Sequence, residues 1–431
     1  MPATNVQGGI LDQAPEHVLA AALSFVAPDV PSCQAAFQNL LELVRRELAA
    51  DIDEIDPDSN PSIPSADTGE LGVETGYDTT RLTITVGVSA SGFQRLGVPA
   101  NELPQDLIPI NWGWFNDTPA NPNEGDLVLQ ICADSSYIVE HVLRRIEHEE
   151  TAAFTIVWTL TGEQRNGANH GEPLTADSAR ALIGFHDGLS NLDPKDPTDQ
   201  QLIFVNQDNA PPYPATPEGQ QPGPQPGQPG YGQPGQSGPV FPSDLRQPPA
   251  QAEPSWTKDG TYLMVRASLL NISSWDQQQL EQQQQTIGRW KYSGATLDNT
   301  NSPAHRRDTP AFATNPSDVA VPLNSHIRRA NPRALPTDPQ RRIFRRGYPI
   351  IIGTPQGTLE RGLLFVSFGR SLSTQAEFIM RAWLKNPNFP QPNTGVDPLF
   401  GMETGVLAGG YYFVPPVADP TQPWNIQIPG V

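Results

Sequence analysis

The sequence predicts an α+β fold made of two similar halves, each a β-sheet layered with helices. Apolar stretches of strand length alternate with stretches whose apolar residues recur at helical spacing, and the strands are not joined by hairpin-length gaps. The outline of residues 18–160 is repeated over residues 262–414. The chain has 431 residues, 37% of them hydrophobic, which is enough for two or three domains with a substantial core.

In the first half, residues 18–25 and 37–48 carry apolar side chains at helical spacing, which predicts two N-terminal amphipathic helices. The acidic stretch over residues 51–78 is rich in Pro and Ser and should form a loop. Apolar residues alternate with Thr and Gly over residues 82–88, as in a strand with one buried face. The remaining predictions are a strand over residues 127–132, a helix with the stripe Ile138, Val142 and Ile146, and a strand over residues 154–160.

In the second half, residues 262–266 predict a strand, and Ser274 predicts the start of a helix, because its spacing to Gln277 is that of a capping box. A strand over residues 363–368 is followed by a helix and by a closing strand. The helix runs through Phe378, Ile379 and Trp383, and the closing strand covers residues 411–414.

Between the halves, residues 211–254 are dominated by Pro, Gln and Gly. Such a composition cannot bury enough apolar surface to offset its ordering entropy. We therefore predict a disordered or polyproline-like insertion, which is either tolerated on the surface or serves as a tether or docking segment.

Charge and cysteine content narrow the function classes. A net charge of −20 argues against nucleic acid or an anionic membrane as the main partner, because both are bound through positive surface. The only cysteines, Cys33 and Cys132, exclude a disulfide framework or a Cys-rich metal site and leave room for one bridge. The first residues show no export signal and no window approaches a membrane span, so we expect a cytoplasmic protein.

Residues 323–333 place one imidazole, that of His326, among several guanidiniums. A neutral imidazole nitrogen can be an axial ligand of haem iron, and arginines such as Arg328 and Arg333 can bind a propionate. A solvated or structural histidine is the alternative for this segment alone, so the haem interpretation requires support elsewhere in the chain.

That support comes from residues 184–188 (Gly-Phe-His-Asp-Gly) and 341–349 (Arg-Arg-Ile-Phe-Arg-Arg-Gly-Tyr-Pro). Together with His326 they resemble the dye-decolorizing (DyP-type) peroxidase family, whose pattern is a Gly-x-x-Asp-Gly loop, a later histidine and then an arginine. The matching positions are Asp187, His326 and Arg345. Further similarity covers residues 287–294, 362–368 and 395–398, with weaker matches at residues 92–97 and 126–130.

The resemblance implies two ferredoxin-like α+β domains with antiparallel sheets and packed helices, as in the dimeric α+β barrel-like superfamily. The N-terminal domain would cover residues 1–190 and end in the Gly-x-x-Asp-Gly loop. An interdomain segment over residues 191–260, which contains the insertion, would lead to a haem-binding domain over residues 261–431. One non-covalent haem b per chain is implied, and no Cys-x-x-Cys-His motif for covalent attachment is present.

The resemblance also implies a role for each matching residue. His326 is the proximal iron ligand, and Asp397, in a Gly-x-Asp-Pro setting, is either its hydrogen-bond partner or a turn former. Asp187 takes a proton from hydrogen peroxide and returns it to the departing oxygen, which favours activity at acidic pH. Arg345 stabilises the negative charge that develops as the O–O bond breaks.

Further haem contacts are expected from His186, Arg328 and Arg333. Gly347 stands where one branch of the family has an Asn, so a second polar group beside peroxide is not expected. The residues expected to line the distal cavity are Leu364 and Phe365 or Phe368.

The sequence therefore predicts a haem peroxidase that reduces hydrogen peroxide and oxidises organic donors such as dyes and phenolics through a ferryl intermediate. Its partners would be hydrogen peroxide and small organic donors, and a homo-oligomer is left open. One alternative is a haem-binding carrier or iron-release protein on the same scaffold. Another is a non-catalytic interaction protein that uses the Pro/Gln-rich segment.

Overall fold

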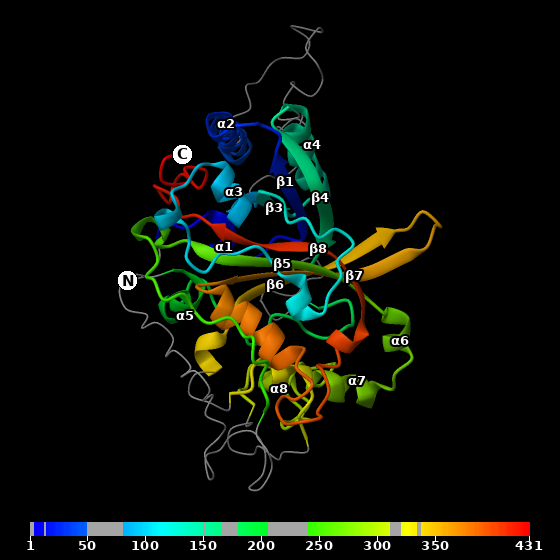
Figure 1. Ribbon diagram of the computed structural model, residues 1–431. Helices are drawn as coiled ribbons and strands as arrows, with labels where there is room; N and C mark the ends of the chain where they lie inside the picture. Colours follow the sequence, from blue (N-terminus) through cyan, green and yellow to red (C-terminus); the bar gives the residue numbers. More distant parts are fainter. Residues whose placement is uncertain are drawn as a thin grey trace.

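The computed structural model describes residues 4–12, 14–49, 81–149, 152–164, 180–205, 239–310, 320–333 and 338–431. Within these residues, eight strands form one antiparallel sheet in the order β4-β1-β3-β2-β8-β5-β7-β6 (Figure 1). The strands are β1 (His17–Phe25), β2 (Thr83–Val88), β3 (Leu127–Ala133), β4 (Phe154–Glu163), β5 (Thr261–Leu270), β6 (Phe344–Gly353), β7 (Leu359–Gly369) and β8 (Glu403–Val414).

The two halves of the sheet have the same strand order. Numbered within its own half, each set of four strands follows the order 4-1-3-2, and helical segments separate the first strand from the second and the third from the fourth. This arrangement confirms the predicted α+β fold with two ferredoxin-like halves. The helices are α1 (Gly8–Leu11), α2 (Val30–Ala49), α3 (Ala90–Arg95), α4 (Ser136–Glu149), α5 (Pro197–Ile203), α6 (Ile272–Asp276), α7 (Leu280–Ile287) and α8 (His326–Ala330), with π-helical stretches η9 (Leu372–Ala376) and η10 (Ile379–Leu384).

The sheet is rolled, so that its two outer strands approach each other. The halves join where Val88 of β2 pairs with Phe413 of β8. At the far edges, Gly162 of β4 lies against β6, because a Cβ on Gly162 would come within 2.7 Å of the Tyr348 Cβ. Residues on the inner face of the roll are therefore enclosed by strands from both halves.

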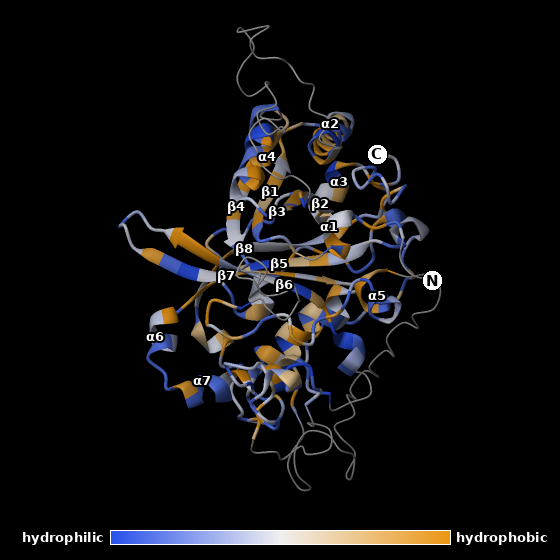
Figure 2. Ribbon diagram, turned by 180° about the vertical axis from the view of Figure 1, so that it is seen from behind, coloured by the Kyte–Doolittle hydropathy of each residue, from blue (hydrophilic) through white to orange (hydrophobic). Residues whose placement is uncertain are grey.

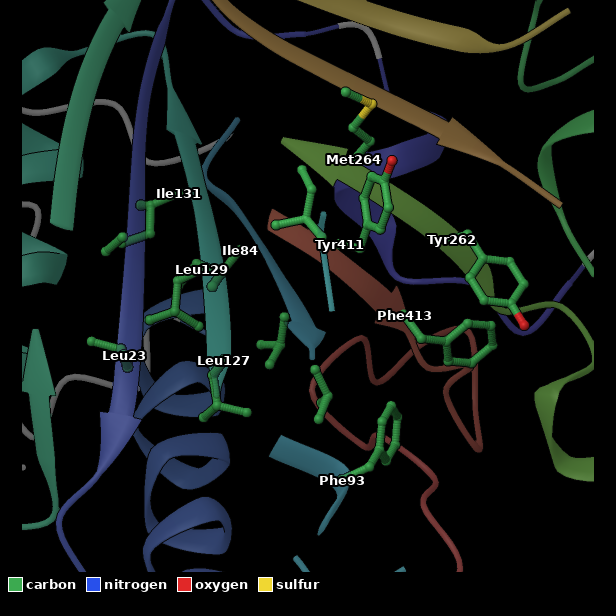
Figure 3. Packing of buried hydrophobic residues seen from close by; sticks show 14 of the residues in the cluster. Leu23, Ile84, Phe93, Leu127, Leu129, Ile131, Tyr262, Met264, Tyr411 and Phe413 are labelled. Atoms are coloured by element: carbon green, nitrogen blue, oxygen red, sulfur yellow. The ribbon is translucent and has the colours of Figure 1, made fainter. Parts of the chain in front are cut away.

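Two apolar cores follow from this shape. One lies between the outer faces of the strands and the helices that cover them, and Figure 3 shows part of it, where Leu127 and Leu129 of β3 and Met264 and Tyr411 of β5 and β8 are buried. The other fills the inside of the roll. Figure 2 shows the hydrophobic strands at the centre and hydrophilic stretches on the outward sides of the helices. Helix α8, which begins with the predicted iron ligand His326, lies with α6 and α7 on one side of the C-terminal strands (Figure 1).

Most predicted elements are present. The strands predicted over residues 82–88, 127–132 and 154–160 correspond to β2, β3 and β4, and those in the second half to β5, β7 and β8. The predicted helix over residues 37–48 lies within α2, and Ile138, Val142 and Ile146 form the buried stripe of α4. The segment 51–78 lies outside the described residues.

The prediction of a helix over residues 18–25 is wrong, because this segment is strand β1. Its Ala- and Leu-rich sequence shows no period-two pattern, since β1 pairs with β3 on one side and β4 on the other and nearly every residue is buried. A strand covered on both faces has a continuous apolar sequence that cannot be told from a helix by periodicity.

Two further boundaries differ from the predictions. Helix α6 begins at Ile272, not Ser274, because the Asn271 side chain caps it by accepting the Ser274 N–H at 3.0 Å. The predicted insertion reached residue 254, but residues 239–254 make defined contacts, including Phe241 against Phe378 at 6.1 Å between ring centroids. The rest of that segment, residues 211–238, lies outside the described residues.

The described cysteines and helices bear on the remaining predictions. Cys33 and Cys132 are both buried and neither forms a disulfide. Among the described helices, none combines the length and the apolar character that crossing a membrane requires.

Candidate functional site

The loop that carries Asp187 is shaped by its two glycines. Gly184 and Gly188 have φ angles of +83° and +75°, a region in which glycine is favoured over other residues. Between them Phe185 is buried and packs edge-on against Trp275, with ring centroids 6.0 Å apart. The Gly188 N–H donates to Asp187 Oδ1 at 2.6 Å. The loop is therefore anchored on both sides of the carboxylate.

Arg345 lies on β6 and faces Asp187. The shortest distance between its Nη2 and the Asp187 Oδ1 is 3.8 Å, with 31% of the Arg345 side chain and 25% of the Asp187 side chain exposed. The structure thus brings together two residues that are 158 positions apart in the sequence. A partly exposed carboxylate beside a guanidinium offers a proton acceptor and a fixed positive charge to a small reactant.

Sequence reasoning missed Asn191, which links the Asp187 loop to Arg345. The Arg345 backbone N–H donates to Asn191 Oδ1 at 3.1 Å, and the Asn191 Nδ2 donates to the Arg345 backbone carbonyl at 2.8 Å. One side chain therefore binds both backbone groups of Arg345, much as a neighbouring strand would. An Asn three residues after the Asp-Gly dipeptide was the available signal, but nothing in the sequence identified its partner.

The register of β6 and β7 defines the face on which Arg345 lies. In this antiparallel pair, Arg345 is opposite Ser367, Gly347 is opposite Phe365, and residue 349 is opposite Leu363. Residues directly opposite share a face, and residues two apart along a strand do as well. Phe365 therefore lies on the expected face, together with Leu363, which the sequence analysis did not select.

The expected contribution of Leu364 and Phe368 to this lining is wrong. Leu364 is opposite Tyr348, and Phe368 is opposite Phe344, on the other face of β7. Both are fully buried in the core inside the roll, where Phe368 stacks on Phe344 at 5.9 Å between centroids. The alternation of side chains along the strand accounts for the error, because Phe365 and the even-numbered residues of β7 lie on opposite faces.

Gly347 lies close to Asp187, and a side chain at this position would be tightly packed. A Cβ at this position would approach Asp187 Oδ2 to 3.0 Å and Leu363 Cδ1 to 3.3 Å. The same distances place the Leu363 side chain close to the Asp187 carboxylate.

His326 opens helix α8 and is held by Asp397. Its Nδ1 lies 2.9 Å from Asp397 Oδ2, and the Asp397 side chain is fully buried whereas 31% of the His326 side chain is exposed. Asp397 Oδ1 accepts the Leu399 N–H at 2.9 Å, so the turn role also applies. With Nδ1 engaged, Nε2 is the nitrogen available to a metal, and the carboxylate orients the ring for that purpose.

Several arginines gather near these segments. Burial, together with the positive charges of Arg333 and Arg345, lowers the pKa of Arg289 to about 10. Burial, together with the charge of Arg342, also lowers the pKa of Arg333 to about 10. Burial and neighbouring arginines disfavour the charged forms of Arg289 and Arg333, and an anionic ligand would favour them, so this arrangement fits a ligand with carboxylates.

Arg328 and His186 have protein contacts of their own. Arg328 is buried and donates to the backbone carbonyl of Val321 at 2.9 Å. The His186 Nε2 lies 2.9 Å from the Arg180 Nη2 and 3.1 Å from the Tyr292 carbonyl oxygen. Haem contacts by either residue, and propionate binding by Arg333, stay predictions.

The donor set fits haem. It combines an imidazole oriented by a buried carboxylate with a group of arginines suited to propionates. The buried Ser325 Oγ and Asn331 Oδ1, at either end of α8, also find no hydrogen-bond partner among the described residues. An apolar cluster containing Phe185, Ile327 and Leu399 packs the segments of Asp187, His326 and Asp397 together.

Comparisons with known proteins agree with this geometry. Residues 7–163 match the family model described as Dyp-type peroxidase, N-terminal, and residues 242–419 match the one described as Dyp-type peroxidase, C-terminal. Deferrochelatase from Shigella flexneri serotype 5b is 28% identical over 369 residues, which cover 85% of this chain and 75% of that protein.

Solved structures show the same fold. A DyP-type peroxidase from Streptomyces coelicolor has a TM-score of 0.70 at 22% identity, covering 97% of this chain and 94% of that one. A DypB variant from Rhodococcus jostii in complex with heme has a TM-score of 0.57 at 18% identity, covering 97% of each chain.

Proposed function

The chain belongs to the Dyp-type peroxidase family, and from this premise we propose that it reduces hydrogen peroxide with electrons taken from organic donors such as dyes and phenolics. Family membership makes it a haem peroxidase, an oxidoreductase acting on hydrogen peroxide, with haem b bound non-covalently. The observation that carries the proposal is the Asp187 carboxylate 3.8 Å from the Arg345 guanidinium on a partly exposed face.

In this proposal His326 binds the iron through Nε2, while Asp397 holds its Nδ1–H. Arg333 and Arg289 neutralise the propionates, which relieves the mutual repulsion of the arginines. When bound, the haem supplies the electrons that cleave the O–O bond and regains them one at a time from the organic donor.

Asp187 moves the proton. Its Oδ1 accepts the Gly188 N–H at 2.6 Å, which fixes the carboxylate and leaves Oδ2 for peroxide. Oδ2 takes the proton from the oxygen that stays and gives it to the oxygen that leaves as water. The backbone at Gly347 lies beside Oδ2 and offers no side-chain group to the peroxide, so Asp187 and Arg345 act without a second polar side chain from that position.

Arg345 stabilises the charge. A guanidinium stays protonated throughout turnover, so it can stabilise the negative charge on the departing oxygen in every cycle. Asn191 holds the Arg345 backbone and so fixes where that charge is presented. Leu363 and Phe365 give the same face an apolar border that limits access of water.

Absorption spectra and turnover test the proposal. The purified protein loaded with haem should show a Soret band that changes on addition of hydrogen peroxide, and it should bleach an anthraquinone or azo dye only when peroxide is present. A Soret band without peroxide-dependent turnover would favour the carrier alternative.

An iron-release activity is a second candidate, because curated relatives such as that of Shigella flexneri are named deferrochelatase. It would use His326 to hold the haem but would not require peroxide. Incubation of the haem-loaded protein without peroxide should then yield free iron and iron-free porphyrin, which fluoresces. Asp187→Ala separates the two functions, since it should impair peroxide turnover most.

Four more detailed inferences from the sequence stay predictions. They are the domain boundaries at residues 190 and 260, the cytoplasmic location, the small organic donors, and a homo-oligomer. The interaction-protein alternative depends on residues 211–254, of which only 239–254 are described. Those residues pack against the remainder of the chain, which leaves residues 211–238 as the segment to test for partner binding.

A further inference from the structure

Arg329 is a fully buried arginine on α8, three residues after His326. Within the described part of the chain, its guanidinium donates hydrogen bonds only to backbone carbonyls, which are neutral. Its Nε finds no hydrogen-bond partner among the described residues. The accepting carbonyls are those of Gly395 at 2.6 Å, Asn386 at 2.7 Å, Leu384 at 3.3 Å and Trp383.

Asp397 is the charged group that favours the protonated form of Arg329. None of the ion pairs within 4 Å that the described residues form involves Arg329. Burial lowers the pKa of Arg329 to about 10, and the negative charge of Asp397 acts in the opposite direction. Asp397 is itself fully buried, so little solvent screens the attraction between the two groups.

Arg329 also fixes the backbone that carries Asp397. The Asp397 N–H donates to the Leu384 carbonyl at 2.7 Å, and Arg329 donates to the same carbonyl. Gly395, two residues before Asp397, accepts from Arg329 as well. One buried cation therefore holds both the position and the charge of the carboxylate that binds His326 Nδ1.

We propose that Arg329 is a positioning residue that limits how much negative charge Asp397 transfers to His326 and thereby sets the reduction potential of the haem bound there. The proposal rests on the proposed function, because it takes His326 as the axial ligand. A carboxylate hydrogen-bonded to the far nitrogen of an axial imidazole makes that ligand more electron-donating, which stabilises oxidised iron. A nearby buried cation draws charge away from the carboxylate and opposes this effect.

Two substitutions at the same position separate charge from shape. Arg329→Gln keeps N–H donors for the carbonyls and removes the positive charge, whereas Arg329→Lys keeps the charge with fewer donors. We expect Arg329→Gln to lower the reduction potential of the haem-loaded protein and to raise its iron–histidine stretching frequency. Arg329→Lys should stay close to wild type in both, and Asp397→Asn should shift both in the opposite direction.

A double-mutant cycle shows whether the effect passes through Asp397. If it does, Arg329→Gln should shift the potential much less in an Asp397→Asn background than in wild type. The matched control is Arg346→Gln, because Arg346 is also buried and also donates to three backbone carbonyls, those of Gly9, Ile10 and Asp12. It lies on β6, and its loss should leave the iron–histidine frequency unchanged.

The outcomes distinguish this inference from the proposed function. A wild-type protein without a Soret band would remove His326 as ligand and the inference with it. With a Soret band present, equal shifts in Arg329→Gln and Arg329→Lys, an undiminished shift in the Asp397→Asn background, or an equal frequency change in Arg346→Gln would each overturn the charge-limiting role alone. Loss of haem from both Arg329 variants would also overturn it, because hydrogen bonding and not charge would then be the function of Arg329.

Discussion

The two pairs of functional residues differ in how tightly the protein holds them. On the His326 side, the imidazole lies 2.9 Å from the fully buried Asp397 carboxylate. The fully buried Arg329 guanidinium binds backbone carbonyls that position Asp397. On the Asp187 side, the carboxylate and the Arg345 guanidinium are 3.8 Å apart, and each is exposed by a quarter to a third. One pair is anchored on a fully buried carboxylate, while both members of the other border the solvent.

This difference has an energetic consequence. Breaking a buried charge pair typically costs about 3–5 kcal/mol, because the remaining partner is left desolvated and unpaired. An exposed pair contributes only about 0–1 kcal/mol. Substitutions on the His326 side should therefore affect cofactor binding and stability together, whereas those at Asp187 and Arg345 should change the rate of reaction and leave stability nearly intact.

His326→Ala should have the largest effect. Removing the imidazole takes away the proposed axial ligand, so we expect loss of the Soret band of bound haem and of all peroxide turnover. His305→Ala is the matched control, since His305 is an exposed histidine bound to Asp308 at 2.8 Å, and it should keep both. An unchanged Soret band in His326→Ala would eliminate His326 as the ligand.

Asp187→Ala and Arg345→Leu should come next. Positioned acid-base groups contribute about 10²- to 10⁴-fold in rate, and a single charge-stabilising donor about 10²- to 10³-fold. Stopped-flow mixing of the haem-loaded variants with peroxide should show slowing of that order. Thermal unfolding should remain close to wild type, because the pair is partly exposed.

The control for these variants is Asp193→Ala, which removes an exposed acid from the same segment. It should react with peroxide at the wild-type rate. If Asp187→Ala proved strongly destabilised and yet reacted normally, the proposed contrast between the two sides would be reversed.

Asn191→Ala should have an intermediate effect. It removes two hydrogen bonds to the Arg345 backbone, each worth about 1 kcal/mol, so we expect a loss of roughly tenfold in the rate with peroxide. Asn191→Asp keeps an acceptor for the Arg345 N–H but lacks the donor. Its rate with peroxide should therefore fall between those of the wild type and Asn191→Ala. Equal rates in all three proteins would show that the strand holds Arg345 without help.

The candidate residues for the chemistry were easier to select from the sequence than the residues that hold them in place. His326, Asp187 and Arg345 were identified because each lies in a short motif whose residue types are dictated by the reaction. Asn191 and Arg329 act through backbone groups of distant segments, and a backbone partner leaves no trace in the sequence. The His326–Asp397 contact was predicted only as one of two alternatives, since an Asp before a Pro forms turns in many folds.

Prediction of the strands was limited in the same way, because it depended on contacts that the sequence does not reveal. Strand β2 was recognised because Thr and Gly alternate with apolar residues in its sequence, although nearly all of its residues are buried. Strand β1 is also nearly all buried, but its apolar sequence is continuous, and it was mistaken for a helix. Strand β6 was not predicted at all, because its sequence carries arginines, a glycine and Pro349. Their suitability for a strand depends on what each face contacts, for example the carbonyls that bind Arg346.

Leu363→Ala and Leu364→Ala should have the smallest effect on catalysis. Together they test which face of β7 borders the site and which face is packed inside the roll. Leu363 shares the face of Arg345, so its loss should change the KM for a bulky azo donor by a few fold, with little effect on a small phenolic donor or on stability. Leu364 is fully buried on the opposite face, so its loss should lower the free energy of unfolding by about 2–5 kcal/mol and leave both KM values unchanged. Steady-state kinetics with the two donors and denaturant unfolding measure both quantities. The opposite pattern, with Leu364→Ala altering donor preference and Leu363→Ala destabilising the protein, would place the reactive face of β7 on the inside of the roll.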